Sequence, residues 1–457
     1  MTSVEFGSLA LALMLLIGGA NLVGLLFLRI RQPRIVGEIL AGILIGPMFL
    51  SKFAPAVGDL FGAKGSGAAG VLGFLYNLGL LLLMFVSGSS VRRVLAKENR
   101  GPTAWLLGCG TTLPFLFGLG LAAFLPLEAL SGPQGAPTTV ALVFAIAVSV
   151  TSIPVISHIF NTLGIIDTRF AALILGVAVL EDIVLWAVLA LATALSAAPI
   201  HGALGNTISA HVGTTIAYLG AGLLIMPPML RYLSSRRWNI LAQHAPLGWI
   251  MTVLLAYVGI ASRLEVTLAF AGFLAGFGII GGMKATERPR FATALDTMSK
   301  FSFATFIPVY TAIIGYRLDF TREFSLLMLV TFLVGSSLIR LAGFGLASYL
   351  GGFRGRDILN LVITSNARGG PGIVLASVAF DAGFINAPFF TTLVVTAILT
   401  SQFAGWWLGH TLRQGWPLLS NSDLRRQGKT MEGITHEDEN PVHVGPVVVA
   451  AGSHHGA

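Results

Sequence analysis

Long apolar runs are the feature that most limits how this chain can fold. The run at 171–194 contains only two charged residues, Glu181 and Asp182, and similar runs recur along the 457 residues. Hydrophobic residues make up 55% of the chain and charged residues 11%, against roughly 25% charged residues in an average soluble domain. Such a chain lacks the residues for a large water-facing surface. Continuous rather than alternating runs indicate membrane-spanning helices, because in lipid the backbone must satisfy its own hydrogen bonds.

These runs divide into thirteen predicted membrane-spanning helices, since a hydrocarbon core of about 30 Å needs about 20 residues. The predicted ranges are 8–28, 33–50, 71–91, 103–126, 138–161, 169–196, 213–233, 246–262, 266–283, 301–316, 324–350, 358–382 and 388–412. Most of the 28 lysines and arginines lie in connections that follow odd-numbered spans. By the positive-inside rule, we expect the N-terminus outside and the C-terminus in the cytoplasm.

The polar C-terminal segment is predicted to lie outside the membrane. We expect residues 1–412 to form one transmembrane domain and residues 413–457 to form a disordered cytoplasmic tail. No glycine-rich phosphate loop follows a predicted strand, so we expect no nucleotide-binding domain. The positive charges are distributed among the connections between apolar spans, so we expect no nucleic-acid partner, and we also expect no cofactor. A single cysteine, Cys109, excludes a disulfide framework.

Two interrupted helices are predicted at corresponding positions of an inverted repeat. The sequence Ala-Gly-Ile-Leu-Ile-Gly at 41–46 is echoed by Ala-Gly-Phe-Leu-Ala-Gly at 271–276, seven predicted helices later. The same offset relates two helices with breaking residues: Pro154 in the fifth, and Asn366, Gly369 and Pro371 in the twelfth. Because seven is odd, the two copies run in opposite directions, and broken helices in inverted copies indicate a transporter site. Two ordinary proline kinks are the alternative.

Glu181 and Asp182 are the strongest functional candidates. A carboxylate in the middle of a membrane-spanning helix costs several kcal/mol, so it is a functional candidate by default. Adjacent carboxylates repel each other, so at least one holds a proton more firmly and can exchange it for a cation. Adjacent residues lie about 100° apart on a helix, so only one of the two can face a site squarely. The alternative is a structural ion pair with Arg340 or Arg368 and no role in transport.

Four further candidates lie inside predicted helices. Arg368 lies at the predicted break of the twelfth helix, where it would neutralise helix dipoles, pair with an acid or serve structure alone. Arg340 is interpreted as a structural charge, Glu38 as a helix-end or funnel residue, and His158 as a packed polar side chain.

Several segments resemble the monovalent cation:proton antiporter superfamily, in the branch of bacterial sodium/proton antiporters, potassium-efflux antiporters and plant cation/proton exchangers. They are 33–47, 148–154, 179–182 and 307–315, and the sequence Asn-Ala-Arg-Gly at 366–369 is similar to the Arg-Gly motif of the plant exchangers' crossing helix. The resemblance covers residues 8–412.

The resemblance implies a homodimer of thirteen-helix subunits, in which a six-helix core moves against a panel of helices at the interface. It implies that Asp182 carries the cation and the proton, with Thr151 and Ser152 lining the site. Two features depart from the family pattern. Family members usually have Asp, Asn or Gln where this chain has Glu181, and electrogenic members carry a lysine in the tenth helix, which 301–316 lacks.

We therefore predict a secondary antiporter, not an enzyme, that exchanges Na⁺ or K⁺ for protons across a bacterial inner membrane. One-for-one, electroneutral exchange is expected, because the tenth span lacks a second titrating group. No resident metal is expected beyond the transported ion. A transporter of another solute, such as an organic anion, stays open. An intramembrane hydrolase is less favoured, since no His-Glu-x-x-His motif is present.

Overall fold

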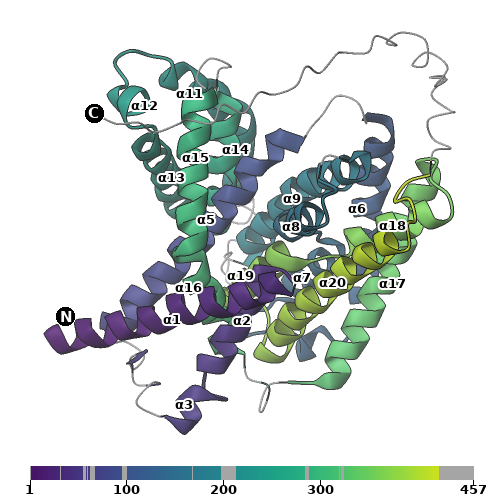
Figure 1. The fold of residues 1–457 in the computed structure, drawn as a ribbon, viewed down its shortest axis with the longest axis horizontal. Coiled ribbons are helices and arrows are strands. Elements are labelled where there is room, and N and C mark those ends of the chain that lie inside the picture. The colour runs from purple at the N-terminus through teal and green to yellow at the C-terminus, as the bar shows by residue number, and fades with distance from the viewer. Residues whose placement is uncertain are drawn as a thin grey trace, which may run out of the picture. The chain divides into compact units, whose positions relative to one another are not determined.

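The computed structural model shows an all-helical architecture (Figure 1). It describes residues 2–30, 32–54, 58, 60–61, 67–94, 100–166, 168–196, 213–283, 288–318, 320 and 324–420. Within these ranges, the β-type pairing is confined to an isolated bridge between Ser131 and Ile385. The predicted fold class is confirmed for the described chain. Most of the predicted tail, from residue 421 onward, lies outside the described residues.

Each of the thirteen predicted spans contains a helix or a pair of helices. The long helices are α1 (Ser3–Arg29), α2 (Arg34–Ile45), α5 (Gly67–Val94), α6 (Arg100–Ala122), α7 (Pro137–Ser149), α8 (Ile153–Thr162), α9 (Arg169–Ser196), a helix over Gly213–Ser234 that ends in α11 (Met226–Ser234), α13 (Pro246–Arg263), α14 (Leu268–Gly282), α15 (Arg288–Ala304), α16 (Phe306–Arg317), α17 (Leu326–Leu350), α18 (Arg356–Ser365), α19 (Gly369–Asp381) and α20 (Ala387–Arg413). Eight helical segments of the described chain are long and apolar enough to cross a membrane. The count of thirteen crossings stays a prediction.

The second predicted span is shorter than expected. It was predicted to cover 33–50, but α2 ends at Ile45 and Gly46 is extended, with φ −66° and ψ −179°. Pro47 follows, and a residue before proline is driven out of the helical region by the proline ring. A short helix, α3 (Leu50–Phe53), comes next. The predicted end at residue 50 is therefore wrong, because residues 46–50 are mostly apolar but do not continue α2.

The tenth predicted span, 301–316, is wrong at its start. The structure has a separate helix, α15, that begins at Arg288, and the chain breaks at Thr305 before α16. Pro308 explains the break, because its ring would clash with the carbonyl of Ala304 in a continuous helix. The charged first half of α15 made this segment look like a connection.

Helix packing divides the described residues into two groups. The panel group consists of α1, α2, α5, α11, α13, α14, α15 and α16, and the crossing group consists of α6, α7, α8, α9, α17, α18, α19 and α20. In Figure 1, α11, α13, α14 and α15 lie together at the upper left, while α17, α18 and α20 lie to the right. The most extensive contact between the two groups is that of α9 with α5 and α14. We call this contact the seam.

Close glycine contacts hold two helix pairs of the panel group together. A Cβ on Gly42 of α2 would lie 1.9 Å from the Ala312 carbonyl oxygen of α16, and one on Gly315 would lie 2.0 Å from the Ile39 carbonyl oxygen. In the pair of α5 and α14, Cβ atoms on Gly88 and Gly276 would lie 2.0 and 2.1 Å from carbonyl oxygens of the facing helix. Small residues let helix backbones approach this closely.

These two pairs are related by the predicted repeat. The seven-helix offset places α2 in correspondence with α14, and α5 with α16. If the two copies of the repeat pack alike, the contact of α2 with α16 should be matched by a contact of α14 with α5. Both contacts are present in the structure. The echoed glycine sequences at 41–46 and 271–276 lie on these contacts. The inverted repeat predicted from the sequence is therefore consistent with the packing.

Candidate ion site at the crossing of two broken helices

Two helices of the crossing group are interrupted at the predicted places. The chain leaves the helix at 150–152, between α7 and α8, and at 366–368, between α18 and α19. Pro154 lies in the first turn of α8, where its ring prevents a helix from continuing through Val150. Pro371 lies in the first turn of α19 and has the same effect on Ala367. Both predicted breaks are confirmed.

The two breaks are tied to each other by hydrogen bonds. The Ser152 amide donates to the Ala367 carbonyl at 2.7 Å, and the Gly370 amide donates to the Ser152 hydroxyl at 3.1 Å. Gly369 has φ +29°, and a Cβ there would lie 2.6 Å from the Ser152 hydroxyl oxygen. A glycine is thus required at 369 both by its backbone conformation and by the closeness of the other break.

Thr151 joins the same crossing. Its hydroxyl donates to the Ser365 carbonyl at 2.7 Å and accepts a hydrogen bond from Arg340. The hydroxyls of Thr151 and Ser152 are thus engaged in holding the crossing together. The resemblance implied that both would line the site beside the break. They do lie at the break, with their hydroxyls directed at backbone and at arginine.

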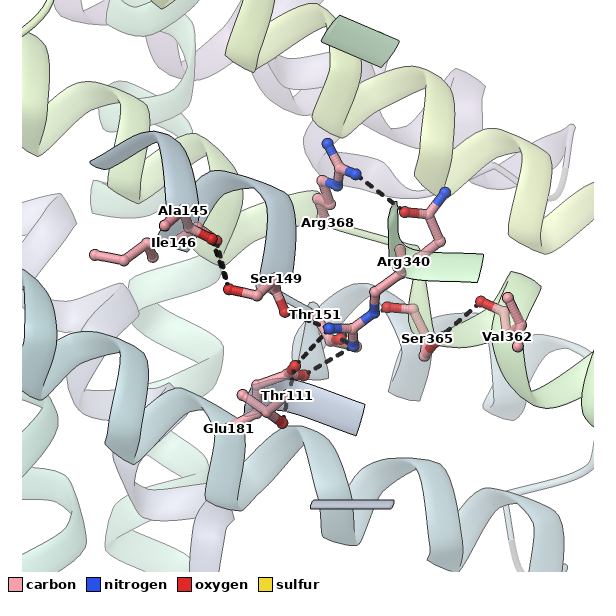
Figure 2. Close-up of polar contacts among 11 residues, drawn as sticks. Thr111, Ala145, Ile146, Ser149, Thr151, Glu181, Arg340, Val362, Ser365 and Arg368 are labelled. Atoms are coloured by element: carbon pink, nitrogen blue, oxygen red, sulfur yellow. Dashed lines mark hydrogen bonds and ion pairs between the residues drawn. The ribbon is translucent and has the colours of Figure 1, made fainter. Parts of the chain in front are cut away.

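Glu181 is held by Arg340, which reaches across from α17 (Figure 2). The Arg340 Nη1 and Nη2 atoms lie 2.7 and 3.2 Å from the Glu181 Oε1 and Oε2 atoms, and both side chains are buried. Thr111 of α6 also donates to Glu181 Oε1, at 3.3 Å. This two-point pair is the strongest geometry for an arginine and a carboxylate. It favours the alternative interpretation for Glu181, a carboxylate neutralised by an arginine.

Arg340 also caps the C-terminal end of α7, which lies at the first helix break. Its Nη1 atom donates to the Ser149 carbonyl at 2.5 Å, next to the Glu181 contact (Figure 2). The last carbonyls of a helix have no partner within the helix and carry partial negative charge. Arg340 thus satisfies both a carboxylate and a broken helix end, which agrees with its interpretation as a structural charge.

Asp182 has very different surroundings from its neighbour. It is fully buried on α9, and Ser87 of α5 donates to its Oδ2 atom at 3.3 Å. Its Oδ1 atom has no hydrogen-bond partner among the described residues. Because Ser87 belongs to the panel group, Asp182 faces the seam, while Glu181 faces the interior of the crossing group. One acid of the pair is therefore fully bonded and the other is available.

Arg368 lies at the second break without an acidic partner. Its Nη1 atom donates to the Ser336 hydroxyl at 2.8 Å, and its Nη2 atom donates to the Asn366 side-chain oxygen at 3.2 Å. The guanidinium also lies 5.7 Å from the centre of the Phe332 ring. No ion pair of the described residues includes Arg368. Of the interpretations left open, neutralising helix dipoles fits this position best.

Glu38 and His158 lie apart from the crossing. Glu38 is buried in the panel group, paired with Arg34 at 2.8 Å and bonded by Thr311 at 2.9 Å. It is therefore a buried ion-paired residue and not a helix-end residue. His158 of α8 is partly buried, and its Nε2 atom has no partner among the described residues.

Three residues of the site gave little signal in the sequence. Ser87, Thr111 and Ser336 contact Asp182, Glu181 and Arg368, but single hydroxyl residues are common in membrane helices, where they often bond to their own backbone. The described residues contain no cluster of three histidines, cysteines or acids. Of the two adjacent acids, Asp182 alone has an oxygen without a hydrogen-bond partner among the described residues.

Comparison with known proteins assigns the chain to a family. Residues 12–414 match the transmembrane region of sodium/hydrogen exchangers. The chain belongs to the sodium/hydrogen exchanger family. As a member of this family, it is a multi-pass membrane protein. The resemblance seen in the sequence is thereby confirmed.

Several relatives of this exchanger-family chain are similar along most of its length. The Na(+)/H(+) antiporter NhaS4 of Synechocystis is 27% identical over 398 residues, covering 85% of this chain and 93% of the relative. The K(+)/H(+) antiporter 1 of Saccharomyces cerevisiae is 26% identical over 406 residues, covering 83% of this chain and 44% of the relative. Cation/H(+) antiporter 19 of Arabidopsis thaliana is 24% identical, with 81% and 45% covered. The chain thus spans a little under half the length of the plant and yeast relatives.

The fold matches a solved structure. The sodium proton antiporter MjNhaP1 from Methanocaldococcus jannaschii superposes with a TM-score of 0.59 at 16% identity, covering 89% of this chain and 97% of the other. The exchanger-family chain therefore has the antiporter fold, with two crossing broken helices.

Proposed function

We propose that this protein exchanges a monovalent cation, Na⁺ or K⁺, for protons by alternating access, with Asp182 as the shared carrier. One observation carries the proposal. Asp182 is a buried carboxylate at the seam between the two helix groups, with an oxygen that no described residue occupies. Two of the relatives are named as a K(+)/H(+) antiporter and a Na(+)/H(+) antiporter, which supports the same function.

The chemistry follows from the difference between the two acids. A buried carboxylate must be neutralised by a proton or by a cation. Asp182 can hold either one, but not both, so binding of the cation expels the proton. Glu181 is already neutralised by Arg340, so it does not compete for the cation. Exchange of one bound ion for the other thus takes place at Asp182 alone.

We propose that Arg368 supports the site from the second break. It donates to Asn366 and Ser336, which fixes the conformation of the segment between α18 and α19. Its positive charge also lies near the carbonyl end of α18, as Arg340 does at the end of α7. With Gly369, Pro154 and Pro371 it keeps two helix ends at the crossing without contributing a cation ligand.

The setting of the protein is proposed from the family and from the charge pattern. We propose a homodimer in a bacterial inner membrane, with the N-terminus outside and residues 413–457 forming a cytoplasmic tail. The concentration of lysine and arginine after odd-numbered spans supports this orientation.

The proposal is tested with purified protein in liposomes that contain a pH-sensitive dye. Addition of Na⁺ or K⁺ should dissipate an imposed pH gradient, and Asp182→Asn should abolish this flux because an amide neither titrates nor carries a charge. Ser87→Ala is the matched control, since it removes the hydroxyl next to Asp182 and keeps the carboxylate. Flux at the wild-type rate in Asp182→Asn would refute the carrier role. Flux driven by an organic anion instead of either cation would refute the substrate class.

A further inference from the structure

Another polar contact crosses between the two helix groups, away from Asp182. Asp381 is the last residue of α19, in the crossing group. Its Oδ1 atom lies 2.7 Å from the Arg317 Nη1 atom, and its Oδ2 atom accepts a hydrogen bond from the Tyr76 hydroxyl at 2.8 Å. Arg317 ends α16 and Tyr76 lies on α5, so both partners belong to the panel group.

The partners of Asp381 also hold each other in place. The Arg317 guanidinium lies 4.5 Å from the centre of the Tyr76 ring, and this ring packs on Tyr310 at 5.0 Å between centroids. The charged side chains are about one-third exposed, 35% for Arg317 and 37% for Asp381. An ion pair with this exposure contributes roughly 0–1 kcal/mol, so it can break and re-form during each cycle.

The helix that carries Asp381 begins at the crossing. The first amides of α19 donate to the hydroxyls of Ser152 and Ser401. A helix of 13 residues spans roughly 20 Å. Since α19 is one continuous helix, its two ends move together. A displacement of the crossing relative to the panel group must therefore move Asp381 away from Arg317 and Tyr76.

We propose that Asp381, Arg317 and Tyr76 form a latch that must open before Asp182 is exposed to the side of the membrane where α16 ends. The latch rests on the alternating access proposed above. By the charge pattern, α16 ends on the outer side, so the latch closes the outward path. Asp381 and Arg317 thus position the crossing group and do not bind the transported ion.

A reversible cross-link tests the latch. In a Cys109→Ala background, Arg317→Cys and Asp381→Cys are joined by a short bis-methanethiosulfonate reagent in liposomes. The linked protein should lose at least tenfold in exchange rate, and a reducing agent should restore it. Asp296→Cys with Lys300→Cys is the matched control, because that ion pair is exposed and lies within α15 alone. The same reagent should leave its exchange unchanged.

The possible results separate the latch from the proposed function. If the unlinked double variant exchanges ions and linking leaves the rate unchanged, the latch is refuted while antiport stands. If the wild-type protein exchanges neither Na⁺ nor K⁺ for protons, the proposed function fails. A second measurement uses charge reversal. Arg317→Asp or Asp381→Arg alone places like charges at the latch, which should hold it open and change the exchange rate, and the two substitutions together should restore the wild-type rate. A double variant whose rate stays at that of the single variants would also refute the latch.

Discussion

Two adjacent carboxylates on α9 have opposite surroundings, and this difference can be measured. Glu181 is bound at both oxygens by Arg340, whereas Asp182 has one long hydrogen bond from Ser87. Removing one partner of a buried ion pair costs roughly 3–5 kcal/mol, because the other charge is left uncompensated. The two acids should therefore contribute differently to folding and to transport.

Glu181→Gln is expected to lower the free energy of unfolding by about 3 kcal/mol, since Arg340 stays buried without an opposite charge. Thermal unfolding in detergent measures the loss. Asp182→Asn is the control, and it should be as stable as the wild type because it removes an unpaired acid. A Glu181→Gln protein as stable as Asp182→Asn would contradict the assignment of the pair.

Replacing both members of the pair gives a sharper test. Glu181→Leu with Arg340→Met should cost less than the sum of the two single replacements, because no charge is then left alone in the interior. Additive losses would show that the two side chains act independently.

The pairing of Glu181 illustrates what sequence reasoning can and cannot give. The position of the two acids within a long apolar run identified them as candidates, and this needed only local information. Their partners are separated from them by long stretches of chain: Arg340 lies 159 residues away from Glu181. Whether Arg340 or Arg368 faced Glu181 depended on helix packing, which no local pattern encodes.

At the scale of helices, local rules predicted the breaks well and the extents of some helices poorly. Pro154 and Pro371 act on the carbonyl four residues earlier, so their effect can be read from the sequence. The break at Thr305 has the same cause, Pro308. The apolar run begins only at 301, so it gives no sign of the polar first half of α15. The seam and the latch depend on packing between distant helices and were not foreseen.

The glycine contacts of the panel group give a prediction for helix pairs. Gly315→Ala would place a Cβ 2.0 Å from the Ile39 carbonyl oxygen, so α2 and α16 must move apart. We expect a loss of about 1–3 kcal/mol in the free energy of unfolding. Gly335→Ala on α17 is the control, because no atom lies within 4 Å of its Cβ position. It should match or exceed wild-type stability, since alanine favours helix. Equal stability of the two variants would contradict the close contact.

At the scale of the whole molecule, the neutralised Glu181 predicts the electrical behaviour of transport. If only Asp182 changes its bound ion, one cation moves for each proton and no net charge crosses the membrane. Liposomes with an imposed membrane potential and no ion gradients should then show no change of internal pH. A proton flux that grows with voltage would show that a second group titrates, and its loss in Glu181→Gln would identify that group.

The long separation of Glu181 from Arg340 has a consequence for how the protein is made. During synthesis at roughly 5–20 residues per second, 159 residues take about 8–30 s. Throughout this interval α9 holds two carboxylates and no arginine to offset either one. The nascent helix must enter the bilayer with its acids protonated, or wait beside the translocation machinery until α17 emerges.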